Sequence, residues 1–231
     1  MTLLDASLIA DLPPFVGMAH DDLKDLVSQA TSARIAKDAS VFIQGEKPNS
    51  FFLLLDGNIK VVRTTPDGEQ VVARYLSAGE LFGIAVALGL ESYPASAVAA
   101  RDCVFLSWPN RIWDTIIVKY PTFRSNSYKV VGERLQDTQE RIVEMVTEKV
   151  EQRVATALLK LIKQTGKKTE SGVLIDFPIT RKDISELTGT THHTVSRLMS
   201  AWENAGIIES GRQKIIVVDG HKLMLIAERN T

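Results

Sequence analysis

The chain has 231 residues, enough for two domains that each bury a core, and its 45% hydrophobic and 24% charged residues are typical of a globular protein. Its net charge of −1 conceals an asymmetry, because residues 151–231 carry 12 Lys and Arg against 9 Asp and Glu, whereas residues 1–150 carry 15 against 19. The single cysteine, Cys103, excludes a disulfide framework within the chain and a metal site built from cysteines alone.

The N-terminal segment has no features of an export signal. It contains Asp5 and Asp11 and lacks the basic region of a signal peptide. The longest apolar run, residues 81–90, is too short to span a bilayer. We therefore expect a cytoplasmic protein with no membrane partner, whose mildly basic C-terminal part suits contact with phosphates.

A short helix is predicted over residues 20–30, with apolar residues on one face and His20 at its cap. A β-rich region follows. From about residue 40 to 106, short apolar runs alternate with turn sequences such as Asp56-Gly57-Asn58. This pattern predicts a small antiparallel β-barrel or jelly roll, with Cys103 as a small buried hydrophobic residue.

A long helix without interior proline is predicted over residues 122–146, after a short helix at 114–120. Apolar residues in the long helix recur at alternating steps of three and four, the spacing of a two-stranded coiled-coil seam. The predicted dimer seam comprises Tyr128, Val131, Leu135, Thr138, Ile142 and Met145. The alternative is that this face packs on the barrel of its own chain, and one helix can serve both contacts.

The remaining chain begins with a predicted hinge at residues 147–152 and a helix at 154–162. A polar loop at 166–172 and a strand at 173–178 follow. These elements lead into the segment with the most specific pattern in the chain.

Residues 180–206 fit a helix-turn-helix from end to end. Thr180 is a suitable N-cap, Gly189 supplies the permissive backbone at which the first helix ends, and Thr190 or Thr191 caps the second helix. An αα-hairpin inside an enzyme is the alternative, but the spacing, the glycine and the polar positions together favour DNA binding.

Two apolar β runs after Gly206 flank a turn at residues 211–213. This hairpin would make the domain a winged helix, with Arg212 and Lys214 available to phosphates.

The barrel, the long helix and the winged helix occur in the order found in the CRP/FNR family of bacterial transcription regulators. The chain resembles this family, and its FNR-like branch in particular, over nearly its whole length. The segments that carry the resemblance are FFLLLDGNIKVV at 51–62, GELFG at 79–83, ERLQDTQ at 133–139 and the helix-turn-helix at 179–199.

The resemblance implies an α+β fold: a cyclic-nucleotide-binding-like β-barrel (jelly roll), a dimerisation helix and a winged helix-turn-helix. The implied domains are 1–120 for sensing, 121–147 for dimerisation and 148–231 for DNA binding. Such a homodimer binds palindromic double-stranded DNA, senses a small signal in its barrel, and recruits or obstructs RNA polymerase.

The resemblance also implies DNA contacts. Arg197 stands where the family places an arginine on a guanine, whose O6 and N7 can accept two hydrogen bonds from one guanidinium. Ser196 matches a serine of the FNR-like branch, whereas His193 replaces a glutamate that accepts from cytosine in most members. The predicted DNA-contacting residues are Arg181, Lys182, Thr190, Thr191, His192, His193, Ser196, Arg197, Arg212 and Lys214. Adjacent helical residues point about 100° apart, so the His-His pair is not expected to chelate a metal.

The barrel sequence argues against two signals known in the family. Ile84 stands where cyclic-nucleotide-binding members carry a ribose-binding glutamate. The chain has no arginine between Arg74 and Arg101, so a cyclic phosphate bound there would lack a charge-assisted partner, and cyclic AMP is not expected. One cysteine cannot hold an iron–sulfur cluster. The candidate pocket residues are Leu81, Phe82, Ile84, Tyr93, Ser96, Leu135, Thr138 and Gln139.

The apolar pocket sequence suits a small apolar effector, haem, or no ligand at all. For haem, His20 is the only histidine outside the DNA-binding part, and a lone histidine on a short polar helix is more often a cap than an iron ligand.

The sequence bears on three rival functions. A cupin-like metalloenzyme needs clustered histidine and carboxylate ligands, but no histidine lies between His20 and His192. A cyclic-nucleotide module without DNA binding does not explain the helix-turn-helix and the wing. A constitutive regulator would differ only in having an empty pocket, and the sequence leaves that possibility open.

Overall fold

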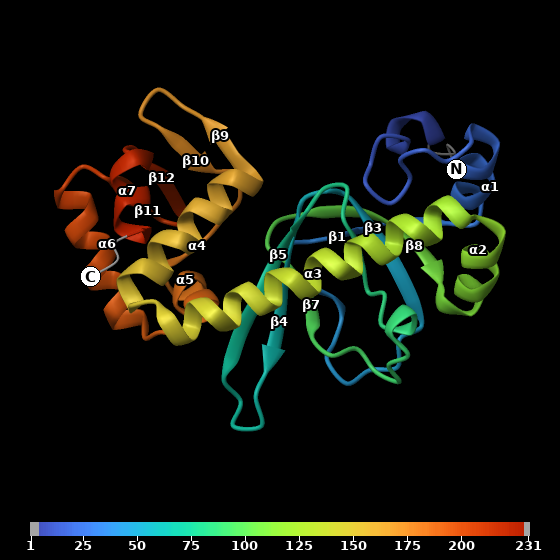
Figure 1. Ribbon diagram of the computed structural model, residues 1–231, viewed down its shortest axis with the longest axis horizontal. Coiled ribbons are helices and arrows are strands. Elements are labelled where there is room, and N and C mark those ends of the chain that lie inside the picture. The colour runs from blue at the N-terminus through green and yellow to red at the C-terminus, as the bar shows by residue number, and fades with distance from the viewer. Residues whose placement is uncertain (1–4, 229–231) are drawn as a thin grey trace. The chain divides into compact units, whose positions relative to one another are not determined.

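The structure is a computed structural model that describes residues 5–228 (Figure 1). The chain has the predicted α+β composition and divides into two compact units. The first comprises residues up to Arg63 together with Tyr75–Thr138, and the second comprises Thr64–Arg74 together with the residues from Gln139 onward. Helix α3 (Pro121–Thr147) runs from the first unit into the second. Within residues 5–228, no helix has both the length and the hydropathy needed to cross a membrane.

Two four-stranded sheets with antiparallel pairing form the predicted jelly roll. One sheet has the order β1-β8-β3-β6 and the other β2-β7-β4-β5, so most neighbouring strands are not consecutive in the chain. The first sheet contains β1 (Thr31–Ile35), β8 (Cys103–Pro109), β3 (Ser50–Asp56) and β6 (Leu81–Phe82). The second sheet contains β2 (Ser40–Phe42), β7 (Ser96–Ala99), β4 (Asn58–Thr64) and β5 (Gln70–Ser77). Residues 64–74, which comprise the end of β4, the turn and the first part of β5, are grouped with the second unit.

Strand β3 is apolar at nearly every position because both of its faces are covered. Phe51 and Leu53 join a core shared with α1 (His20–Ser28), α2 (Trp113–Lys119) and the start of α3. Phe52 and Leu54 join a second core between strands. Since alternate residues of a strand point to opposite faces, the uninterrupted run FFLLL is the sequence of a strand placed between two cores.

Some elements of the first unit differ from prediction. The sequence pattern does not predict β1, which has the mostly polar sequence TSARI, or β7, whose small residues SAVA lack a strong β signal. Three short 3-10 helices are also unpredicted: η1 (Ala6–Ile9), η2 (Val86–Leu88) and η3 (Asn110–Ile112). The predicted cap of α1 is wrong, because Ala19 is the N-cap and His20 is the first helical residue.

Helix α3 leaves most of its predicted seam uncovered within the chain. Its first turns are anchored in the first unit by the fully buried Phe123. Farther along, Tyr128, Leu135 and Ile142 are 53%, 59% and 60% exposed, at steps of seven residues. Val131 is half-buried and packs on the core of its own unit, so the alternative of packing on the barrel is right for this residue.

Cys103 is a buried residue of β8, as predicted. It is 1% exposed, and its sulfur lies 3.3 Å from the carbonyl oxygen of Asn58 and 3.1 Å from that of Arg101. Burial raises the pKa of the thiol above its ordinary value, so the reactive thiolate is disfavoured.

The second unit contains the predicted winged helix. Its helices are α4 (Val150–Thr165), α5 (Arg181–Thr188), α6 (His192–Asn204) and α7 (Gly220–Ala227). Its sheet has the order β11-β12-β10-β9, formed by β11 (Ile208–Gly211), β12 (Lys214–Val217), β10 (Val173–Ile175) and β9 (Gly166–Lys168). The buried side chains of its helices include Val154, Leu158, Ile184, Val195, Met199, Trp202 and Leu223.

Two predicted boundaries in this unit are wrong. Helix α4 begins at Val150, so the hinge after α3 is shorter than predicted, and the side chain of Gln152 caps α4 by accepting from the N–H of Lys149 (2.9 Å). Residues 166–168 form strand β9 rather than a loop, because backbone pairing with β10 orders a polar segment that has no apolar alternation.

Substitution of Gly57 tests the tight β3–β4 turn. At this glycine φ is 99°, and an added Cβ would lie 2.5 Å from the sulfur of Cys103 and 2.6 Å from the carbonyl oxygen of Asp102. We expect Gly57→Ala to lower the free energy of unfolding by about 2 to 4 kcal/mol, because backbone strain and overpacking add. Gly68→Ala is the matched control, since its φ is 83° but no heavy atom lies within 4 Å of the added Cβ. Urea unfolding would contradict the steric account if both variants lost the same amount.

Candidate nucleic-acid interface

A capped helix, a tight turn and a second helix form the centre of the candidate interface. Thr180 is the N-cap of α5: its Oγ1 accepts from the N–H of Asp183 (3.1 Å), and the Asp183 carboxylate accepts from the N–H of Thr180 (2.9 Å). Gly189 follows α5 in the left-handed conformation, with a φ of 62°. Thr191 caps α6 by accepting from the N–H of Thr194 (3.1 Å). The predicted helix-turn-helix is confirmed, with the second of the two candidate threonines in the capping position.

Helix α6 has one buried face and one polar face. Val195, Met199 and Trp202 are buried and hold the helix on the core of its domain. Thr191, His192 and His193 at its start are exposed, as is Arg197 in the second turn. Ser196, and Thr190 just before the helix, are half-buried. These polar side chains lie in and just before the first two turns, at the positive end of the helix dipole, where an anion is favoured. Because its buried face holds it in place, this helix presents its hydrogen-bonding side chains to solvent.

The hairpin of β11 and β12 carries two exposed basic residues. Ser210 pairs with Ile215 and Gly211 pairs with Lys214, so Arg212 and its neighbour form the turn, as predicted. Arg212 and Lys214 are both exposed. Their cations therefore have the solvent access that phosphate contact requires.

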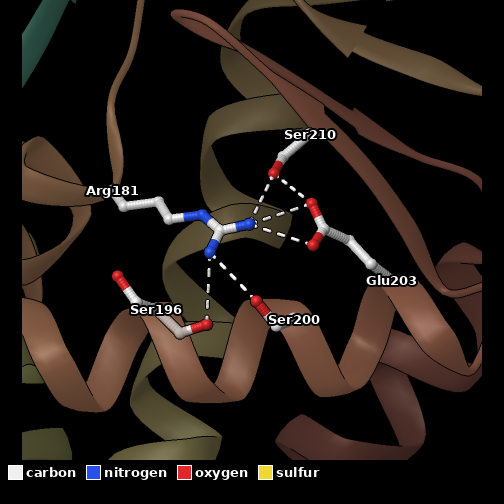
Figure 2. Close-up of polar contacts among 5 residues, drawn as sticks. All are labelled: Arg181, Ser196, Ser200, Glu203 and Ser210. Atoms are coloured by element: carbon white, nitrogen blue, oxygen red, sulfur yellow. Dashed lines mark hydrogen bonds and ion pairs between the residues drawn. The ribbon is translucent and has the colours of Figure 1, made fainter.

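The two basic residues at the start of α5 have different surroundings. Lys182 has a 73% exposed side chain and forms a long ion pair with Glu186 (3.6 Å). The guanidinium of Arg181 instead reaches across to α6 and β11 (Figure 2), and its side chain is only 28% exposed. Its Nη2 lies 2.9 Å from Oε2 of Glu203. The structure thus separates Arg181 from the exposed residues with which sequence analysis grouped it.

Three partners of Arg181 were not identified from the sequence: Ser200, Glu203 and Ser210. Ser196, Ser200 and Glu203 follow one another at steps of four and three, which indicates a single polar face of a helix. That spacing is a usable signal, but the sequence does not show that Arg181 and Ser210 meet this face.

The two histidines of α6 are exposed at consecutive positions. Among residues 5–228, the structure contains no group of three or more His, Cys, Asp and Glu side chains suited to holding a metal ion. His20 is also exposed, at the first residue of α1.

The predicted effector-pocket residues of the barrel are divided between different surroundings. Leu81 and Ile84 belong to the core that includes α1 and α2, whereas Phe82 belongs to the second core. The Tyr93 hydroxyl donates to the carbonyl oxygen of Ser50 (2.6 Å), and Ser96 Oγ accepts from the N–H of Gln44 (2.9 Å). Both hydroxyl groups therefore form hydrogen bonds with the backbone of the barrel itself.

An aromatic cluster extends outward from the second core, which contributes Phe52, Phe82 and Phe105. Tyr93 stacks on Phe42 with ring centroids 3.8 Å apart, and Phe52 packs against both Phe42 and Phe82 at 5.7 and 5.1 Å. Phe105 and Phe52 form a T-shaped pair with ring centroids 5.5 Å apart. We call these five residues the aromatic cluster.

The remaining effector candidates lie on α3. Leu135, Thr138 and Gln139 are all exposed, and the hydroxyl of Thr138 donates to the carbonyl of Arg134 one helical turn earlier (2.8 Å). The chain by itself does not enclose these three side chains.

Comparison with known proteins agrees with this architecture at both ends of the chain. The family described as a Crp-like helix-turn-helix domain matches residues 152–226. The family described as a cyclic nucleotide-binding domain matches residues 33–120.

Similar proteins match over most of the chain. The electron transport regulator A of Shewanella oneidensis is 27% identical over 207 residues, covering 90% of this chain and 82% of that protein. The cyclic AMP receptor protein of Thermus thermophilus is also 27% identical, over 215 residues, covering 93% of this chain and 96% of that protein. The solved structure of FixK2 from Bradyrhizobium japonicum has a similar fold, with a TM-score of 0.75 and 20% identity over 87% of this chain and 99% of that chain.

The exposed cations of the hairpin predict a salt-dependent effect on DNA binding. Arg212→Ala is expected to weaken binding to all sequences equally and to reduce the slope of log affinity against log salt by about 1, because one phosphate contact and its released counterion are lost. Lys24→Ala, which removes an exposed cation from α1, is the control and should leave the slope unchanged. A sequence-dependent loss for Arg212→Ala would contradict the phosphate assignment.

Proposed function

Because the chain belongs to the CRP/FNR family of bacterial transcription regulators, we propose that it acts as a homodimer that binds a two-fold symmetric DNA operator and thereby regulates transcription. Members of this family are regulators and not enzymes. The observation that carries the proposal is helix α6, which is held by its buried face and exposes polar side chains on its first two turns beside a basic hairpin. This is the form required of a helix that enters a major groove.

Arg197 is the residue that we assign to direct base reading. It is exposed one helical turn after His193, on the same side of α6. An arginine in this place can donate two hydrogen bonds to a guanine, whereas a neutral histidine can either donate or accept one. We therefore propose a half-site guanine opposite Arg197 and assign no particular base opposite His193.

The homodimer is supported by the apolar stripe on α3. Large apolar side chains stand exposed at positions 128, 135 and 142, and a second copy of the helix would cover them at coiled-coil spacing. Dimerisation through this stripe would give two recognition helices related by a two-fold axis. The domain assignment that follows is 1–120 for sensing, 121–147 for dimerisation and 148–231 for DNA binding.

We further propose that the bound dimer acts on transcription by recruiting or obstructing RNA polymerase, and that its N-terminal barrel responds to a small apolar signal other than cyclic AMP. One relative's name refers to cyclic AMP. In this chain Ile84 replaces the glutamate that would meet the ribose, and this side chain is 5% exposed. Haem remains a weaker candidate, because the histidine available to it is exposed on α1.

A constitutive regulator is the second candidate, and the aromatic cluster favours it. Phe42, Phe52 and Phe82 stack pairwise, and Tyr93 stacks on Phe42. An added Cβ at Gly83 would lie only 2.7 Å from the ring of Phe52. A protein whose barrel is filled by its own side chains could bind its operator without an effector. Refolding in ligand-free buffer separates the two candidates, because only a constitutive regulator would recover full operator affinity.

Replacement of Arg197 tests the proposed function directly. Arg197→Ala is expected to lose about 1 to 3 kcal/mol of operator affinity, with the loss concentrated on one base pair of each half-site. Titration against operators mutated at each position would measure this, with Lys24→Ala as the control that binds like the wild type. If Arg197→Ala keeps the affinity and base preference of the wild type, α6 does not read the groove in the proposed way.

Cyclic AMP provides a second test. We expect millimolar cyclic AMP to leave operator affinity and the thermal unfolding temperature unchanged, since residues 75–100 contain no Arg or Lys that could form a charge-assisted bond to the cyclic phosphate. Cyclic guanosine monophosphate is the matched control for a non-specific nucleotide effect. A rise in unfolding temperature specific to cyclic AMP would contradict the sensing proposal.

A further inference from the structure

The Arg181 side chain lies at the centre of a polar network in the second unit (Figure 2). Its Nη1 donates to the backbone carbonyl of Ser196 (3.3 Å) and to Oγ of Ser200 (3.1 Å). Its Nη2 donates to both carboxylate oxygens of Glu203 (3.0 and 2.9 Å) and to Oγ of Ser210 (3.0 Å). Ser210 in turn donates to Oε1 of Glu203.

This network joins three elements of the DNA-binding domain. Arg181 is the first residue of α5, Ser196 to Glu203 lie on α6, and Ser210 lies on β11. Two of its contacts are next to residues assigned to DNA. Ser196 immediately precedes Arg197, and Ser210 is two residues before Arg212.

We infer that Arg181 is a positioning residue for sequence-specific DNA binding: its guanidinium fixes the recognition helix and the wing relative to α5, and it does not itself neutralise a phosphate. This inference rests on the proposed function. It replaces the phosphate or base contact that sequence analysis assigned to Arg181.

The charges of the network support this role. Glu203 and Arg181 have side chains 27% and 28% exposed, so each ion is partly removed from water and needs the other. Burial alone would raise the pKa of the Glu203 carboxyl, but hydrogen bonds from Ser210 and Arg181, together with the charge of Arg181, hold that pKa below its ordinary value. Glu203 is therefore an anion at neutral pH. A phosphate that approached Arg181 would compete with this carboxylate and be repelled by it.

The geometry also explains why an arginine is suited to the position. A planar guanidinium can direct separate N–H groups to α6 and to β11 at fixed angles, whereas a lysine ammonium is a single point charge on a flexible stem. Losing the guanidinium would leave Glu203 partly buried without its cation and would free the wing from α6. The DNA-contacting residues of α6 and those of the wing would then no longer be held in a fixed position relative to each other.

The test compares Arg181→Gln, Glu203→Gln and the double variant in operator binding over a series of salt concentrations. Each single variant is expected to lose about tenfold in operator affinity, the equivalent of one charge-assisted hydrogen bond, and the double variant is expected to lose no more than the worse single. The salt slope should stay at the wild-type value in all three. Arg212→Ala is the matched variant for a true phosphate contact, with a slope reduced by about 1.

Whether Glu203→Gln strengthens or weakens operator binding distinguishes a phosphate contact from a positioning role for Arg181. Removal of an anion near DNA would strengthen binding if Arg181 served a phosphate, because the arginine would be freed for it. Weaker operator binding with an unchanged non-specific affinity supports a positioning role. A tighter Glu203→Gln complex, or an Arg181→Gln slope reduced by about 1, would overturn it.

Two further measurements guard against simple unfolding. Ser210→Ala removes only the two side-chain hydrogen bonds that link the wing to Arg181 and Glu203, so it should fold and should lose hydroxyl-radical protection at the phosphates next to the wing while keeping protection in the major groove. Full protection at both places would overturn the inference. Arg181→Lys should not restore affinity, and full rescue by lysine would likewise contradict the role of the planar guanidinium. If the wild-type protein selects no DNA sequence, the proposed function itself fails, a result that none of the variant comparisons would give.

Discussion

Helix α6 can present His193 and Arg197 outward only because Val195, Met199 and Trp202 are buried on its opposite face. This burial fixes the rotation of the helix about its axis, since a turn of about 100° would exchange apolar and polar residues. The Arg181 network adds a polar constraint at the flank of the same helix. The apolar face thus determines which side chains are exposed, and the polar network determines how they stand relative to the wing.

The first unit has a different organisation, in which apolar residues fill both sides of β3. Among the helices that the structure describes, α3 is the only one whose large apolar residues recur exposed at steps of seven. A dimer formed through this stripe would bury these residues, and in the proposed function the same helix would then both join two copies and connect the sensing and DNA-binding regions. The aromatic cluster raises a specific physical question for sensing, because an effector must either displace these rings or act elsewhere.

Sequence patterns predicted the elements whose residues carry a local signal. The helix-turn-helix followed from Thr180, Gly189 and Thr191, because caps and a left-handed glycine are chosen by the local backbone. Strands β1 and β9 could not be predicted in this way, since their polar residues are ordered by backbone pairing, that of β1 with the distant β8 and that of β9 with the next strand, β10. The environment of Arg181 could not be predicted from the sequence either, because its partners lie up to 29 residues away and are brought to it only by the fold. Arg212 and Lys214 are exposed, as expected. The predicted pocket residues lie apart, because Leu81 and Ile84 belong to one core, Phe82 belongs to the other, and those on α3 are exposed.

The central claim is that two copies of this chain read a symmetric DNA site through α6. Selection of binding sites from random double-stranded DNA with the purified wild-type protein tests it most directly. The account predicts enriched palindromes whose half-sites are centred about one helical turn apart, roughly 10 base pairs, with a guanine in each half-site. Enrichment of a single unsymmetrical site bound by one chain, or no enrichment above the starting library, would contradict it.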